Sequence, residues 1–230
     1  MKYTFPIEIL QEGFQLLITK AGGTLVLVNF VFSLVFGLGS LLAAVLIFGP
    51  ATLFLKDSFL LWFVLPLLVI VFAVVLIVFF VFVQFVILFF LMRIYEKKEP
   101  IVSIEAFQNE TTRFKLYMEA ALQAAAQILM GLVMFIVPGV QAFFKYFMVG
   151  PIAVFEYSSQ LQTTAILSKS EKITEGHRWQ LAYLFIGILL LYLLMRFILG
   201  SVFTQLFLTP VISTYFTICV VIYYKKLLKG

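Results

Sequence analysis

Long apolar runs separated by short polar segments make up most of the chain. A transmembrane helix needs about 20 predominantly apolar residues, and six runs meet that length. They cover roughly residues 22–48, 59–92, 114–137, 140–158, 180–199 and 202–224. The fourth run is short and contains Gly150 and Pro151, where we expect a kink. The pattern predicts an all-α fold, a polytopic membrane bundle of about six transmembrane helices.

Three polar segments carry apolar residues at helical spacing and precede apolar runs. The first places Ile7, Leu10 and Phe14 on one face, the second covers 101–112, and the third covers 163–175. Such segments predict amphipathic helices that lie in the membrane interface. Together with the spans they suggest a three-fold pseudo-repeat, 5–92, 101–158 and 163–224, within one integral membrane domain of residues 1–230. Simple anchoring of the bundle is the alternative role for these helices.

Basic residues predict the orientation. With the N-terminus inside, 13 of the 16 Lys and Arg residues fall on the cytoplasmic side, as the positive-inside rule requires. We therefore expect a multi-pass protein of the cell (inner) membrane with both termini cytoplasmic. The net charge of +5 accompanies 63% hydrophobic and only 12% charged residues, so it indicates topology and not a nucleic-acid partner. Tyr223 and Tyr224, followed by two lysines, predict an interfacial belt at the C-terminus.

The segment 138–179 combines turn, span and amphipathic signals. Its distinctive residues are Pro138, Gly139, Pro151, Glu156, Ser170, Gly176 and Trp179. This pattern resembles a broad group of bacterial six-helix membrane proteins of unknown function, including the membrane domain fused to some glycerophosphodiester phosphodiesterases. The resemblance implies the fold and not the activity, because these residues include no phosphodiesterase domain.

The same segment has a physical interpretation. Pro138 and Gly139 predict a tight turn of a hairpin on the outside. Gly176 is placed to end the third amphipathic helix, and the ring of Trp179 suits the headgroup level.

Polar residues inside the spans are candidates for function, because burying them in lipid is costly. Glu119, Gln123 and Gln127 recur every four residues in the third span. Lys145 and Glu156 lie eleven positions apart in the fourth, roughly 16 Å, too far to pair directly. These five form either helix contacts or a polar path. Asn29 and Gln84 are isolated polar residues that we expect to hydrogen-bond across helices, and Ser213 and Thr217 belong to a hydroxyl stripe beside Pro210.

The candidate headgroup-binding residues lie in or just after the third amphipathic segment: Lys169, Lys172, His177 and Arg178. No catalytic, nucleotide-binding or metal-binding motif is evident, so we expect no enzyme activity, no cofactor and no metal. The favoured hypothesis is a non-enzymatic membrane protein that binds lipid head groups or a membrane-protein partner, which includes a second copy of itself. The alternative is a small transporter or channel for a lipid or amphipathic solute along spans 3 and 4.

Overall fold

The computed structural model describes residues 6–54, 61–97, 110–158, 160–199 and 208–229, and this part of the chain is helical without strands. Its helices are α1 (Pro6–Leu17), α2 (Lys20–Phe54), α3 (Leu61–Lys97), α5 (Thr111–Met134), α6 (Ile136–Lys145), α7 (Val149–Phe155), α8 (Thr163–Thr174), α9 (Arg178–Leu199) and α11 (Thr209–Lys229). Six stretches are long and apolar enough to cross a membrane. The predicted all-α, multi-pass membrane fold is confirmed.

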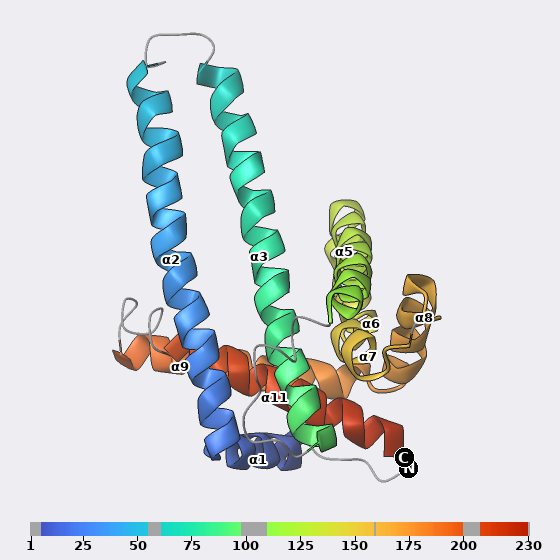
Figure 1. Cartoon of the computed structure of the whole chain (residues 1–230). Helices are drawn as coiled ribbons and strands as arrows, with labels where there is room; N and C mark the ends of the chain where they lie inside the picture. Colours follow the sequence, from blue (N-terminus) through green and yellow to red (C-terminus); the bar gives the residue numbers. More distant parts are fainter. Residues whose placement is uncertain (1–5, 55–60, 98–109, 159, 200–207, 230) are drawn as a thin grey trace.

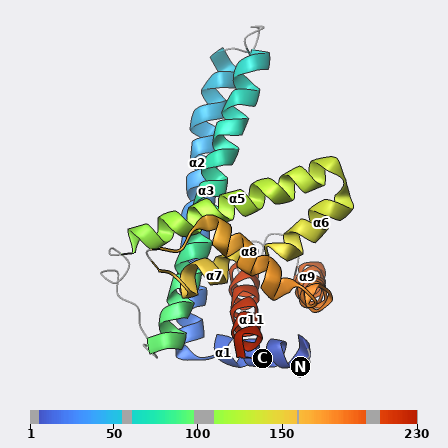
Figure 2. The same cartoon turned by 90° about the vertical axis from the view of Figure 1, so that its right-hand side faces the viewer.

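Helices α2 and α3 form a long hairpin whose far part stands clear of the other helices (Figures 1 and 2). Apolar residues surround both helices, so large side chains such as Leu38 and Leu67 are more than half exposed. A helix that is apolar on all sides belongs in lipid or in a core. Nearer the chain termini, α11 crosses the hairpin and packs on both α2 and α3.

The fourth predicted span is broken, but not at the predicted position. Helix α6 ends at Lys145 and α7 begins at Val149, so the break precedes Gly150. Pro151 lies buried in the first turn of α7. A proline is tolerated there because the first turn of a helix does not use its N–H groups for internal hydrogen bonds.

The hairpin between the third and fourth spans also turns earlier than predicted. Phe135 has extended backbone angles, φ −162° and ψ 151°, between α5 and α6. Pro138 and Gly139 lie inside α6, so the prediction that they form the turn was wrong. Proline fits the first turn of a helix as well as it fits a loop. Gly139 is needed there for close packing, since a Cβ would lie 2.4 Å from the Leu132 side chain.

Two of the three predicted amphipathic helices are present as α1 and α8. In α1, Ile9 and Gly13 face the protein, whereas Ile7 and Phe14 on the predicted apolar face are more than half exposed. In α8 the predicted apolar face is buried against protein, including Ser170. The second amphipathic segment lies almost wholly outside the described residues, so the three-fold repeat stays a prediction.

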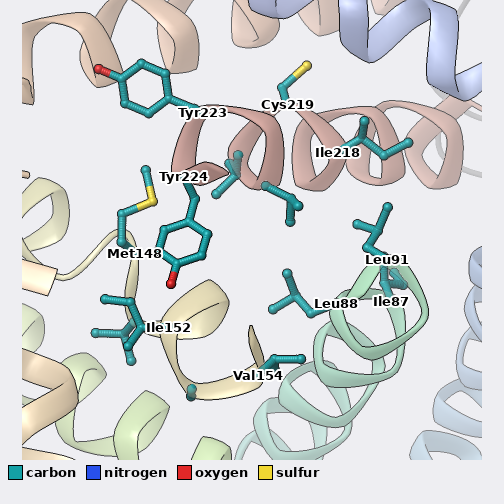
Figure 3. Packing of buried hydrophobic residues seen from close by; sticks show 14 of the residues in the cluster. Ile87, Leu88, Leu91, Met148, Ile152, Val154, Ile218, Cys219, Tyr223 and Tyr224 are labelled. Atoms are coloured by element: carbon teal, nitrogen blue, oxygen red, sulfur yellow. The ribbon is translucent and has the colours of Figure 1, made fainter. Parts of the chain in front are cut away.

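The core lies where α3, α7 and α11 pack together, and α1, α5, α8 and α9 add buried residues around it. Figure 3 shows Tyr224 extending from α11 beside Met148, with Ile152 nearby on α7. Tyr223 and Tyr224 are at most 2% exposed, so the prediction that they form an interfacial belt was wrong. Their rings fill the core, and their hydroxyls bond Gln180 and Glu156.

Candidate functional site

Two ion pairs connect helix α8 to the fourth predicted span, which contains α6 and α7. Lys145 Nζ lies 2.7 Å from Glu171 Oε1, and Lys169 pairs with Glu156. The Ser170 hydroxyl also donates to the Lys145 carbonyl oxygen at 2.9 Å. Lys145 and Glu156 were predicted to be too far apart to pair with each other, and each of them indeed pairs with a residue of α8.

Glu156 has a further partner in the core. The Tyr224 hydroxyl donates to its carboxylate, which also accepts from Lys169. This arrangement ties α8, the end of α7 and α11 together. Lys169 is thereby neutralised by a carboxylate, so it is a weaker headgroup ligand than its sequence position suggested. Lys172 is exposed and lies on the outer face of α8.

The polar stripe of α5 does not line an interior path. Glu119, Gln123 and Gln127 are exposed, and Gln127 accepts a hydrogen bond from the Tyr146 hydroxyl at 2.6 Å. A carboxylate such as Glu119 is costly against lipid, so this face of α5 suits water or protein. The structure does not gather the five predicted path residues into one site, because Lys145 and Glu156 are held by α8 instead.

A groove of about 550 Å³ lies between α6 and the start of α9. Its lining consists of Ile136, Val137, Val140, Gln141, Phe144, Arg178, Trp179 and Ala182. Most of these side chains are apolar, and Arg178 is the charged residue among them. The sequence pointed to Arg178 and Trp179 but missed Gln141. The missed signal was a lone polar residue three positions before Phe144, on the same helical face.

Gly176 lies in the turn between α8 and α9. It has a positive φ of 80°, a conformation that glycine adopts without strain, and it directly follows the C-cap of α8. The prediction that Gly176 ends this helix is confirmed. The chain then turns so that Arg178 begins α9 and Trp179, 78% exposed, stands beside it.

Arg178 has an unused donor. Its Nε is buried and has no hydrogen-bond partner within the described part of the chain. A buried unpaired donor is unfavourable, more so when the group is charged, and a guanidinium matches phosphate or carboxylate oxygens. Neighbouring His177 places Nδ1 3.1 Å from the Glu175 carbonyl oxygen, a local contact. Arg178 is therefore the strongest anion-binding candidate of the four predicted residues.

Comparisons with known protein families, with curated proteins and with solved structures found no match. The resemblance of segment 138–179 to six-helix bacterial membrane proteins stays a prediction.

Proposed function

We propose that this multi-pass membrane protein is not an enzyme and binds an anionic phospholipid in the groove between α6 and α9. The observation that carries the proposal is the buried, unpaired Nε of Arg178 at an otherwise mostly apolar groove. The guanidinium takes the lipid phosphate, and the apolar wall takes an acyl chain. Trp179 stands at the headgroup level, where amphipathic rings are favoured.

The apolar residues that α6 contributes to the groove suit an acyl chain. Val137, Val140 and Phe144 recur at helical spacing and so share one side of the helix. On the α9 side the groove is lined by Ala182, one turn after Arg178, and its small side chain leaves space for an acyl chain. A chain lying here leaves its head group at the beginning of α9, where the helix dipole also favours negative charge.

The surface of α8 is less suited to binding lipid head groups than the groove between α6 and α9. The apolar face of α8 is covered by protein, and Lys169 is paired with Glu156. Both facts reduce what α8 offers to a membrane surface. The guanidinium of Arg178 lines the groove and has no ion pair or hydrogen bond within the described part of the chain, so it is the better headgroup ligand.

We also propose that the protein resides in the cell (inner) membrane with both termini cytoplasmic. Lys226 Nζ lies 2.6 Å from Glu12 Oε1, which supports a common side for α1 and the C-terminal end of α11. The distribution of basic residues supports the cytoplasm as that side.

Lipid preference tests the headgroup assignment. The protein is reconstituted into phosphatidylcholine vesicles, and its association with spin-labelled phosphatidylglycerol is compared with that of spin-labelled phosphatidylcholine. We expect the wild type to prefer the anionic lipid and Arg178→Gln to reduce its affinity for that lipid about tenfold, because a hydrogen bond to a charged group contributes about 1.5–3 kcal/mol.

Arg196→Gln is the matched control, because it removes the same charge from the other end of α9, where Arg196 is exposed. This variant should keep the wild-type preference. Equal preference in Arg178→Gln and wild type, or none in wild type, contradicts the proposal.

The transporter hypothesis has less support. None of its five residues, Glu119, Gln123, Gln127, Lys145 and Glu156, lines the groove between α6 and α9 or the cavity described next.

A further inference from the structure

A second cavity, of about 440 Å³, lies where α3, α5, α7 and α11 meet, and it shares no lining residue with the groove between α6 and α9. Its polar lining residues are Gln84, Tyr117, Tyr146, Ser213 and Thr217. The rest are apolar and include four phenylalanines, and none of the described residues that line it is charged. A ligand for this cavity is therefore neutral, because an unpaired charge would be strongly disfavoured there.

Tyr117 is the unexplained group in the cavity. Its side chain is only 5% exposed, yet its hydroxyl has no hydrogen-bond partner among the residues that the structure describes. The ring is held in place, since its centroid is 5.2 Å from that of Phe85. Gly150 also lies beside the ring, since a Cβ there would be in ordinary van der Waals contact with Tyr117 Cε2, at 3.5 Å. The side chain is buried, but its oxygen is not among the fully buried atoms, so this fixed hydroxyl without a partner among the described residues is open to a ligand that can satisfy it.

The other polar groups indicate what the ligand must offer. Thr217 donates its hydroxyl hydrogen to the Ser213 carbonyl oxygen at 2.9 Å and lies 3.4 Å from Gln84 Oε1. The Ser213 hydroxyl oxygen accepts from Asn29 at 2.8 Å. The groups left over are the Tyr117 hydroxyl, the hydrogen of the Ser213 hydroxyl and the Gln84 amide nitrogen, each of which can donate. One ligand group satisfies any of them if it is an acceptor, such as a carbonyl oxygen.

The aromatic walls favour a flat ligand. The ring centroids of Phe143 and Phe147 are 5.5 Å apart, and those of Phe147 and Phe216 are 5.8 Å apart. These three rings pack edge to face on one another, at interplanar angles of 75° and 81°, and form an aromatic wall against which the ring of a ligand can also pack. The volume also lies within the usual range of small-molecule sites, about 300–1,000 Å³.

We propose that this cavity binds the ring of a membrane-soluble quinone, with Tyr117 donating to a ring carbonyl. A quinone is neutral, flat and rich in carbonyl acceptors, and its apolar tail suits a cavity between membrane helices. The site is separate from the anionic-lipid groove and does not depend on it.

Binding of decylubiquinone to the purified full-length protein in detergent micelles tests the assignment, with the bound quinone measured after rapid gel filtration and extraction. We expect saturable binding by wild type and about tenfold weaker binding by Tyr117→Phe, which keeps the ring and removes only the hydroxyl. Tyr183→Phe, at an exposed tyrosine of α9, should bind like wild type. Arg178→Gln should also bind like wild type, which separates this site from the lipid groove.

Ala125→Leu, at a cavity-lining position exposed on α5, fills the space without disturbing Tyr117 and should abolish binding. Wild-type affinity in both Tyr117→Phe and Ala125→Leu contradicts the proposal. Preferential, saturable binding of diacylglycerol over quinone by wild type also overturns it, because the occupant is then a lipid ester.

Discussion

A single polar residue joins the first and last described spans. Asn29 is 4% exposed, and its amide nitrogen lies 3.0 Å from the Pro210 carbonyl oxygen, 2.8 Å from Ser213 Oγ and 3.0 Å from Thr214 Oγ1. Three acceptors thus converge on one NH₂ group. The sequence predicted that Asn29 would bond across helices and that hydroxyls would stand beside Pro210. It did not predict that these two features would meet.

Replacing Asn29 with leucine keeps the branched shape of the side chain and removes the donors. We expect Asn29→Leu to lower the free energy of unfolding by about 1–2 kcal/mol, because interhelical hydrogen bonds in membranes are individually modest. Unfolding in mixed micelles with increasing dodecyl sulfate measures the change. The control is Ser40→Ala, since the Ser40 hydroxyl donates to the Gly37 carbonyl oxygen of its own helix, α2. Equal stability of Asn29→Leu and Ser40→Ala would contradict this account.

At the scale of elements, the crossing of α5 and α6 depends on two glycines. A Cβ on Gly131 would lie 3.0 Å from Gly139 Cα, and a Cβ on Gly139 would lie 2.7 Å from the Leu132 backbone nitrogen. Small residues allow this backbone approach. The Pro-Gly pair obeys local rules both as a turn and as the start of a helix, so local rules alone could not place the turn at Phe135. The position of the turn depends on the packing of Gly139 against Leu132, which is a tertiary contact.

Adding a methyl group tests this crossing. We expect Gly139→Ala to destabilise the protein by about 1–3 kcal/mol, the usual cost of overpacking, because backbone atoms of α5 must move. The matched control is Gly187→Ala in α9, where nothing lies within 4 Å of the added Cβ; it should be neutral or stabilising, since alanine favours helix. Thermal unfolding in detergent, followed by circular dichroism, compares the two. A Gly139→Ala midpoint at or above that of Gly187→Ala would rule out the tight crossing.

At the scale of the whole molecule, α11 connects otherwise separate helices. Besides Asn29 of α2, it reaches α1 through Tyr215, whose hydroxyl donates to the Leu10 carbonyl oxygen at 2.8 Å. It reaches α9 through Tyr223, which donates to Gln180 at 2.6 Å, and the end of α7 through Tyr224. Hydroxyls on different sides of α11 thus bond residues of α1, α2 and α9 and the residue that ends α7, and Thr217 also lies 3.4 Å from Gln84 of α3.

Cysteine labelling tests the orientation of the molecule. In a Cys219→Ser background, Lys172→Cys on α8 and Arg196→Cys near the end of α9 place exposed thiols on opposite predicted sides. With a membrane-impermeant maleimide and intact cells, we expect Arg196→Cys to react at once and Lys172→Cys only after permeabilisation. The buried Cys219 needs replacement so that its thiol adds no background. The reverse order of labelling would invert the proposed topology.

The sequence predicted features that depend on local pattern. Six apolar stretches, the helix at α8 and its end at Gly176 follow from composition and spacing, and they are confirmed. The prediction for Tyr223 and Tyr224 was wrong because the sequence around a tyrosine beside lysines is the same whether its hydroxyl meets a lipid head group or, as here, a side chain of the protein. Tyr117 was missed as a site residue for a related reason. Only the packed structure shows that its hydroxyl lacks a partner.

The contact between Asn29 and Pro210 has a consequence for biosynthesis, since the two residues are 181 positions apart. At about 5 to 20 residues per second, a ribosome reaches Pro210 about 10 to 40 seconds after Asn29. Throughout that interval the Asn29 amide is inserted without its final partners and depends on water, lipid carbonyls or the insertion machinery. The first hairpin therefore completes its packing only when the last span arrives, and a chain truncated before α11 presents an unpaired amide that membrane quality control can recognise.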